Sequence, residues 1–142
     1  MQSVRDFFVF DLICDGTEIA TPITISATNS EQFLHNCTAI WDTGATSSMI
    51  SQRTAQELQL SPHGTVKVSG VHGVGNANVY FVNLVFNNGY EIPNIQVSEA
   101  GNNAGFDILV GMDVISRGIF IVDGVNHATR GCQIAFALPL DK

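Results

Sequence analysis

The chain has 142 residues, of which 45% are hydrophobic and 13% charged, and its formal net charge is −7. A chain of this length can bury enough apolar surface to hold a core without disulfides or a structural metal. We therefore expect one domain over residues 1–142. The excess of 13 acidic over 6 basic residues argues against a nucleic-acid partner. No apolar run approaches the ~20 residues that a membrane-spanning helix needs, so no membrane partner is expected.

The amino-terminal segment has Asp6 and Asp11 beside and within a short apolar run, and no small-residue cleavage site follows it. This pattern is not typical of a signal peptide. The cysteines, at positions 14, 37 and 132, are odd in number and lack C-x-x-C spacing, which favours reduced, buried thiols and a cytoplasmic location. The four histidines have no metal-ligand spacing, so we expect no metal and no other cofactor.

Short β-branched and aromatic runs, separated by Gly, Asn and Asp, predict an all-β domain. The predicted strands are residues 7–13, 21–27, 37–41, 80–86, 90–97, 106–110, 118–124 and 132–138. We expect the first two to flank a turn at Asp15-Gly16 and to form an amino-terminal hairpin. Asn88-Gly89 predicts a second hairpin with a type I′ turn, because both residue types tolerate positive φ.

Two stretches look helical, residues 51–60 and the brief segment 112–117. Pro62 ends the first of them. The side chains expected to face the core from this helix are Ala55, Leu58 and Leu60. No internal repeat or linker composition indicates a second domain.

Residues 40–47, IWDTGATS, place Asp42 between a buried strand and a tight turn. A carboxylate in such a position is costly unless it is hydrogen-bonded. Gly44 lets the backbone bend so that amide groups approach the carboxylate, and Thr43 and Thr46 offer hydroxyl donors. Taken alone, an Asp-Thr-Gly sequence is equally compatible with an aspartate that starts an ordinary turn.

The sequence DTGA after apolar residues, combined with ILVGMDVI near the carboxyl end, resembles the retropepsin-like aspartic proteases of retroviruses and bacteria. The resemblance covers the order of elements over most of the chain. It implies a closed or partly open β-barrel of the acid protease fold, with one or two short helices, a flap hairpin and one lobe per chain. It also implies that Asp42 is catalytic. The residues that it implies as active-site support are Thr43, Gly44, Ala45, Leu109, Val110 and Gly111.

Aspartic-protease chemistry needs two carboxylates that share one proton and activate water, without a metal. This chain has one Asp-Thr-Gly, and neither Asp15 nor Asp123 supplies a second. We therefore expect a two-fold homodimer with Asp42 of each copy in one site. The resemblance further implies that the Thr43 hydroxyl bonds across the two-fold axis and that the Gly44 backbone orients the carboxylates.

The glycine-rich segment VSGVHGVGNANVYFVNL resembles the flap of this family, a hairpin that closes over an extended peptide substrate. An ordinary mobile hairpin tip would have the same composition. The candidate flap and substrate-binding residues are Val71, Gly73, Val74, Gly75 and Val79.

Two functions remain open from the sequence. One is an aspartic endopeptidase that cuts extended, mainly apolar segments of peptide or protein substrates; the other is a non-catalytic dimerisation or peptide-binding module on the same fold. The extra length relative to retroviral enzymes is expected in the amino-terminal segment and in residues 122–131. The last strand, residues 132–138, is either part of an interface sheet or an internal strand.

Overall fold

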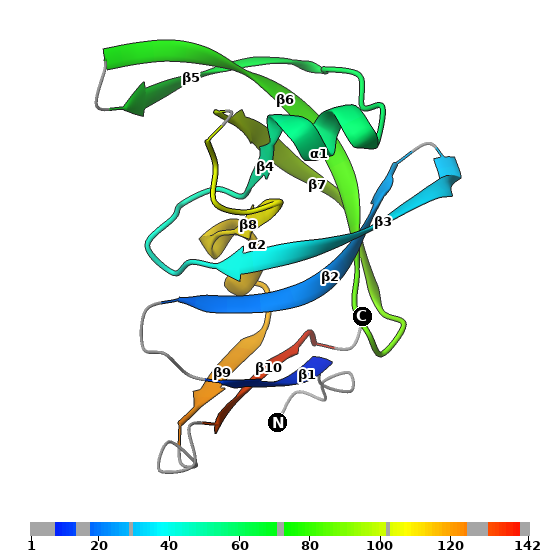
Figure 1. The fold of residues 1–142 in the computed structure, drawn as a ribbon, viewed down its shortest axis with the longest axis vertical. Coiled ribbons are helices and arrows are strands. Elements are labelled where there is room, and N and C mark those ends of the chain that lie inside the picture. The colour runs from blue at the N-terminus through cyan, green and yellow to red at the C-terminus, as the bar shows by residue number, and fades with distance from the viewer. Residues whose placement is uncertain are drawn as a thin grey trace.

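The computed structural model describes residues 8–13, 18–28, 30–70, 73–101, 103–124 and 131–139, and strands make up most of them (Figure 1). The elements are β1 (Phe8–Ile13), β2 (Ile19–Ala27), β3 (Ser30–Trp41), β4 (Met49–Ser51), α1 (Gln52–Glu57), β5 (Gly64–Gly70), β6 (Gly73–Val85), β7 (Glu91–Ala100), β8 (Ile108–Val110), α2 (Met112–Ile115), β9 (Ile119–Asp123) and β10 (Gly131–Ala137). The predicted all-β class with two short helices is confirmed. Within the described ranges, neither helix has the length and apolar character needed to cross a membrane.

The larger sheet has the strand order β2-β3-β8-β4-β7-β6-β5, and an additional pairing joins β2 to β6. This pairing closes six of the strands into a ring, with β5 attached to the outer half of β6. Most of the buried aliphatic side chains come from these strands, and Ile25, Val82, Val97 and Ile108 have no measurable exposure. A ring of strands around an apolar interior is a small β-barrel, as predicted.

The smaller sheet has the order β1-β10-β9. The predicted hairpin between the first two strands is wrong, because β1 pairs with β10, whereas β2 pairs with β3. The residues around the predicted turn, 14–17, lie outside the described part of the chain. The first half of β3 is mostly polar and its two apolar residues, Phe33 and Leu34, are adjacent, so the sequence contained no apolar alternation to mark the true partner of β2. β10 lies between two strands of its own chain and is therefore an internal strand of this sheet.

Aromatic side chains join the two sheets. Phe8, Phe136 and Phe120 are neighbours on adjacent strands of the smaller sheet. Trp41, the last residue of β3, stacks on Phe120 with 5.2 Å between ring centroids and contacts Phe136 at 5.4 Å. The indole N–H of Trp41 donates a 2.9 Å hydrogen bond to the Thr21 hydroxyl, so its polar atom is satisfied in the core.

The Asn88-Gly89 hairpin between β6 and β7 forms as predicted, but its turn is not type I′. Only Gly89 has a positive φ, of 88°, whereas a type I′ turn needs positive φ at two successive central residues. The Gly89 N–H donates to the Phe86 carbonyl, and the Phe86 N–H donates to the Tyr90 carbonyl. This is a three-residue loop in which glycine takes the left-handed position.

The first helix is shorter than predicted. Ser51 caps α1 through a hydrogen bond from the Thr54 N–H to its hydroxyl, and the helix ends at Glu57, with Leu58 as its C-cap, instead of continuing to Leu60. Gln59 adopts a left-handed φ of 54°, and the Leu60 N–H bonds back to the Ala55 carbonyl at 3.0 Å. This C-terminal cap stops the helix before Pro62 is reached. Ala55 and Leu58 are buried, as predicted, and Leu60 packs against the core.

Candidate active site

Asp42 directly follows β3 and lies where two distant stretches of backbone meet. Its N–H donates a 2.9 Å hydrogen bond to the carbonyl of Val110 at the end of β8. The Gly44 N–H donates a 2.8 Å hydrogen bond to Asp42 Oδ1, and the Ala45 N–H donates to the Asp42 carbonyl at 3.2 Å. The carboxylate is half-buried and oriented by backbone on one side. The predicted approach of a backbone amide at Gly44 to this carboxylate is thus present.

The strand β8 places the predicted support residues beside this loop. β8 runs parallel to β3, with Ile40 opposite Leu109 and Trp41 opposite Val110, and antiparallel to β4. The Met112 N–H then donates a 2.8 Å hydrogen bond to the Ala45 carbonyl. Two hydrogen bonds, from Asp42 and to Ala45, thus attach both ends of the Asp-Thr-Gly turn to the β8–α2 segment.

Gly111 has a steric reason to be glycine. A Cβ at this position would lie 2.8 Å from the Ala45 carbonyl oxygen and 2.9 Å from the carbonyl carbon and oxygen of Ser47. These are backbone atoms, which cannot move aside as a flexible side chain could. The close approach of two backbones therefore depends on the absence of a side chain at residue 111.

Ser48 and Asp113 form a further connection for which the sequence analysis proposed no role. The Asp113 carboxylate accepts from the Ser48 N–H at 3.0 Å and from the Ser48 hydroxyl at 2.8 Å, and the Gly111 N–H donates to the Ser48 hydroxyl oxygen at 3.0 Å. Ser48 is only 1% exposed. The Val114 N–H, in the first turn of α2, also donates to Asp113 Oδ1 and so helps to hold this carboxylate in place. The second half of the loop is therefore fixed to the start of α2.

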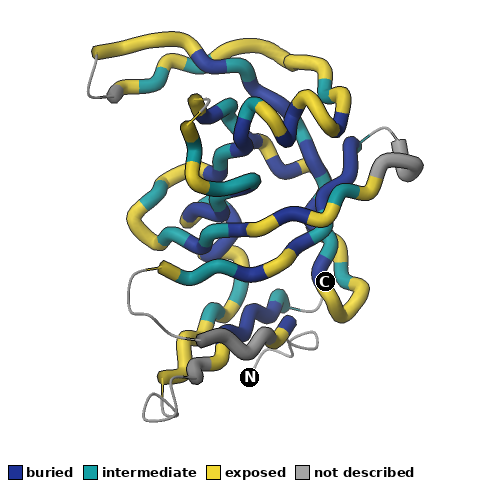
Figure 2. Tube along the Cα trace, viewed as in Figure 1, coloured by how far each residue is buried: buried dark blue, intermediate teal, exposed yellow. Residues whose placement is uncertain are grey.

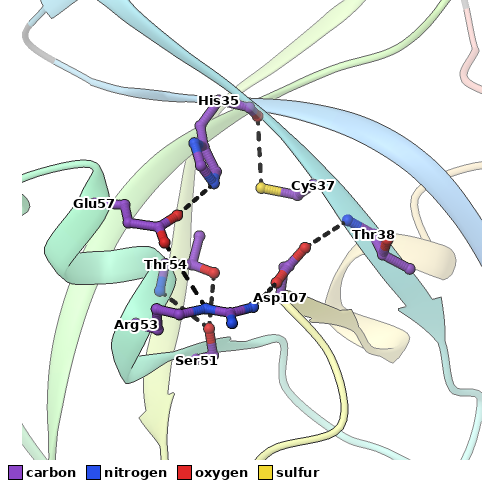
Figure 3. Close-up of polar contacts among 8 residues, drawn as sticks. All are labelled: His35, Cys37, Thr38, Ser51, Arg53, Thr54, Glu57 and Asp107. Atoms are coloured by element: carbon purple, nitrogen blue, oxygen red, sulfur yellow. Dashed lines mark hydrogen bonds and ion pairs between the residues drawn. The ribbon is translucent and has the colours of Figure 1, made fainter.

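A second polar cluster lies at the opposite end of β8 (Figure 3). The Asp107 carboxylate accepts from the Thr38 N–H at 2.8 Å and from the Arg53 guanidinium at 3.2 Å, and the Asp107 carbonyl accepts from the Ser51 N–H. This one residue thus connects β3, β4, α1 and β8. The sequence offered no signal for it beyond its place at the start of a predicted strand.

The same view shows a histidine and a cysteine of β3 facing α1. The His35 Nε2 atom lies 2.8 Å from a carboxylate oxygen of Glu57. Cys37 is a buried free thiol, and its pKa is raised from 9.0 to about 12. The main cause is burial, and the negative charges of Asp107 and Glu57 add smaller contributions. A thiol held neutral in this way is a packing group and not a nucleophile. Cys14 and the side chain of Cys132 lie outside the described residues.

The predicted flap residues lie along the β5–β6 hairpin. Gly70 and Gly73 form the last pair of its ladder, and Gly73 has a positive φ of 105°. Gly73, Val74 and Gly75 are exposed near the tip (Figure 2). Val79 is 6% exposed at the base of the hairpin, where it pairs with Gly64. Val71 lies outside the described residues. Thr43 is exposed on the Asp-Thr-Gly turn.

Residues 34–117 match the family model described as "gag-polyprotein putative aspartyl protease". The match spans more than half of the chain and includes both the Asp-Thr-Gly turn and the β8–α2 segment. The chain belongs to this retropepsin-like aspartic protease family. β1, β9 and β10 lie outside the matched range.

One solved structure of a retropepsin-like protease shares the fold, and two other solved structures match with lower scores. A retropepsin-like aspartic protease from Rickettsia conorii superposes with a TM-score of 0.58 at 16% identity, over 97% of this chain and 98% of that one. Simian Foamy Virus (mac) protease matches 68% of this chain and 92% of its own, with 18% identity and a TM-score of 0.47. The retroviral protease-like domain of Ddi1 from Leishmania major matches 84% of this chain and 93% of its own, with 19% identity and a TM-score of 0.49. The fold comparison rests on the first of these. No curated protein matches the chain by sequence.

Proposed function

We propose that this chain is an aspartic endopeptidase in which one domain, residues 1–142, provides half of each active site. Two copies would place their Asp42 carboxylates together across a two-fold axis. The observation that carries the proposal is the position of Asp42: its backbone is bonded to Val110, and its carboxylate accepts from the Gly44 N–H. Membership of the aspartic protease family supports the same role.

Two carboxylates about 3 Å apart do not both ionise, so the pair retains one proton. The ionised carboxylate accepts a proton from a water molecule as that water attacks the scissile carbonyl carbon. The protonated carboxylate donates its proton to the carbonyl oxygen, which gives a tetrahedral diol intermediate. The carboxyl group that took the water proton then protonates the amide nitrogen, and a diol hydroxyl gives its proton to the other carboxylate as the C–N bond breaks, so the pair again holds one proton. Because the two groups titrate together, cleavage should pass through a maximum as pH is varied.

The β5–β6 hairpin is the candidate substrate lid in this proposal. Its outer half is exposed and the part near the tip is glycine-rich, whereas Ala77 and Val79 of β6, at its base, are buried. An extended peptide could pair with its backbone, and Val74, which is 71% exposed, would contact apolar substrate side chains. Thr43 would bond across the two-fold axis and hold the two Asp-Thr-Gly turns in register.

The proposal is tested by cleavage of an unfolded peptide library with the wild type and with Asp42→Asn, from about pH 4 to 7. We expect cuts between apolar residues with the wild type and a loss of at least about a hundredfold in rate with the variant. The activity per chain should fall on dilution, since each site needs two copies.

Glu91→Gln is the matched control, because it removes an exposed carboxylate at the start of β7, outside the Asp-Thr-Gly turn, and should leave the rate unchanged. Absence of any cleavage that depends on Asp42 would refute the endopeptidase. If the wild type and Asp42→Asn then bound peptides with equal affinity, the chain would be a peptide-binding module.

A further inference from the structure

The helix α1 connects β4 to the β5–β6 hairpin. It begins directly after β4, and only residues 58–63 separate its end from Gly64, the first residue of β5 (Figure 1). Within this short link the His63 N–H donates a 2.8 Å hydrogen bond to the carbonyl of Val79 on β6. The base of the hairpin is thus attached to the segment that follows α1, so a displacement of α1 would carry the hairpin with it.

Charged side chains attach α1 to two strands of the barrel (Figure 3). Near the start of the helix, Arg53 Nη2 lies 3.2 Å from Asp107 Oδ1, next to the first residue of β8. At the end of the helix, a carboxylate oxygen of Glu57 lies 2.8 Å from His35 Nε2 on β3, and its other oxygen lies 3.8 Å from Arg53 Nε. Both ends of α1 are therefore tied to the barrel, one through Arg53 and the other through Glu57.

The Asp107 carboxylate is the better fixed of the two ends of its ion pair with Arg53. Asp107 Oδ2 accepts from the Thr38 N–H at 2.8 Å, which leaves Oδ1 for Arg53. The Asp107 N–H donates to the Thr38 carbonyl at 3.3 Å, and its carbonyl accepts from the Ser51 N–H at 2.9 Å. The side chain of Asp107 is 21% exposed, whereas that of Arg53 is 75% exposed. Because backbone groups of β3 and β4 hold Asp107, this residue positions α1 and not the reverse.

We propose that Asp107 is a positioning residue which, through Arg53, sets where the β5–β6 hairpin lies relative to the turn that bears Asp42. The inference rests on the proposed function, in which the hairpin is the substrate lid and Asp42 is catalytic. Asp107 immediately precedes β8, which is three residues long, and Val110 at the other end of β8 accepts from the Asp42 N–H. One short strand thus connects the attachment of α1 to the attachment of the catalytic turn.

The lid and the catalytic turn are held by different contacts, which predicts the kinetic constant that should change. The hydrogen bonds that fix the turn run from Asp42 to Val110 and from Ser48 to Asp113, and neither involves Arg53. Loss of the Arg53–Asp107 ion pair should therefore leave the carboxylate in place and loosen the lid. A lid that pairs with the peptide equally in the ground state and the transition state contributes uniform binding, whose loss raises KM and leaves kcat nearly unchanged.

An exposed ion pair of this kind usually contributes little to stability. Its loss should not detach α1 from the core, because Ala55 and Leu58 are each only 2% exposed. We therefore expect Arg53→Gln to unfold at nearly the same urea concentration as the wild type and yet to bind substrate less tightly. An ion pair with a merely structural role would change neither KM nor the lid.

The first test compares KM and kcat of the wild type, Arg53→Gln and Arg53→Lys on one peptide taken from the cleaved library. Enzyme is used at concentrations where activity per chain no longer rises, so that assembly does not limit the rate. We expect Arg53→Gln to raise KM by about three- to tenfold and to change kcat by less than about twofold. Arg53→Lys keeps the positive charge and should recover part of the loss.

Glu91→Gln is the control for a change of one exposed charge. Glu91 is the first residue of β7, whereas Ala100 at the other end of that strand pairs with Ser51, beside α1. Both kinetic constants should stay unchanged in this variant.

A double variant tests whether Asp107 acts through Arg53. Asp107→Asn removes the charge that faces Arg53, so its KM should rise at least as much as that of Arg53→Gln. If the two residues act as a pair, the double variant should raise KM no further than Asp107→Asn alone. Effects that multiply in the double variant would overturn the proposal.

A further measurement requires no cleavage. Without substrate, the amides of residues 64–70 and 73–79 in the hairpin should exchange about threefold faster or more in Arg53→Gln than in the wild type. Residues 108–110 should exchange at the same rate in both proteins. Equal exchange in the hairpin would overturn the proposal.

The outcomes separate this inference from the proposed function. Asp42-dependent cleavage with an unchanged KM in Arg53→Gln would overturn the positioning role and leave the endopeptidase intact. Faster exchange in the hairpin of Arg53→Gln, in a protein without Asp42-dependent cleavage, would support the hold of Asp107 on the hairpin and refute the enzyme. A kcat that falls as much as KM rises, with unfolding at a lower urea concentration, would indicate general destabilisation and overturn the inference.

Discussion

Asp42 is attached to residues far away in the sequence, and these attachments decide how it can act. Its own N–H bonds to Val110, and the loop after it is fixed through Ser48 to Asp113, 65 residues further along the chain. A catalytic carboxylate is effective only if its position is set before substrate arrives. The rigidity of this site therefore depends on the β8–α2 segment as much as on the Asp-Thr-Gly turn.

Gly111→Ala tests that dependence. Its Cβ would approach backbone atoms of Ala45 and Ser47 to within 2.9 Å, so the two segments must separate. We expect the free energy of unfolding to fall by about 1–3 kcal/mol or more, and cleavage to fall with it. Gly105→Ala is the control, because nothing lies within 4 Å of the added Cβ. Equal unfolding curves for the two variants would show that the close approach at Gly111 is unimportant.

Cys37 provides a pH-dependent prediction. Burial raises the pKa of this thiol to about 12, whereas in the unfolded chain it keeps its ordinary value of 9.0. The unfolded chain thus loses the proton first as pH rises, so this group contributes no destabilisation below about pH 9 and lowers stability progressively between about pH 9 and 12.

We expect the wild type to lose about 1 kcal/mol more stability than Cys37→Ala between about pH 8 and 10, measured by urea unfolding at both values. Equal pH dependence of the two proteins would contradict the assigned cause. The folded wild type should also resist alkylation at Cys37 near pH 8, and the protein unfolded in guanidinium should react.

The residues of the site that could be predicted are those that belong to short contiguous sequence motifs. Asp42, its turn and the Leu109-Val110-Gly111 run are short contiguous patterns, and the structure places them together. Ser48, Asp113 and Asp107 have hydrogen-bond partners 65 to 69 residues away, and each looks like an ordinary polar residue in its own segment. Such contacts are visible only once the strands have been placed.

At the scale of elements, the end of α1 shows how a cap overrides a periodic pattern. The apolar spacing predicted a helix as far as Leu60, but Gln59 adopts the left-handed conformation and the chain turns away. A non-glycine residue in this conformation costs roughly 1 kcal/mol compared with glycine.

We therefore expect Gln59→Gly to stabilise the protein by about 0.5–1 kcal/mol, as measured by thermal or urea unfolding. Gln56→Gly is the matched control, since Gln56 is exposed within the helix, where glycine costs about 1 kcal/mol. If Gln59→Gly destabilised the protein instead, the left-handed cap would not be the conformation in solution.

Strand prediction succeeded where a segment is rich in apolar residues and failed where it is not. The predicted runs at residues 80–86, 106–110 and 132–138 all coincide with strands of the structure. The first half of β3 was missed because it is mostly polar, and the partner of β1 was misassigned because β10 lies more than a hundred residues away in sequence. Non-local pairing depends on packing, here of Phe8 on Trp41 and Phe136, and not on any local pattern.

At the scale of the whole molecule, the net negative charge of each copy opposes the proposed dimerisation. Each copy carries a formal net charge of −7 at pH 7, and the sequence pI is about 4.7. Two such copies repel each other at neutral pH, and the repulsion weakens as carboxylates are protonated. We expect the proposed dimer to tighten as pH falls from 7 toward 5, and added salt to reduce this difference.

Sedimentation at both pH values, repeated with Asp42→Asn, separates two sources of the effect. The proposed pair of Asp42 carboxylates takes up a proton on dimerisation only in the wild type, whereas the general charge acts in both proteins. A dimer that weakens on acidification in both proteins would show that local charge pairs outweigh the net charge.

The aromatic contact next to the candidate site also means that tryptophan fluorescence can report on unfolding, assembly and peptide binding. Trp41 is the only tryptophan in the chain and is 4% exposed; it stacks on Phe120 of β9 and immediately precedes Asp42. All indole emission therefore arises from one position. Unfolding should shift that emission to the red as water reaches the ring, whereas a partner copy or a bound peptide should alter its intensity without that shift. Assembly and occupancy of the site can thus be followed without any attached label.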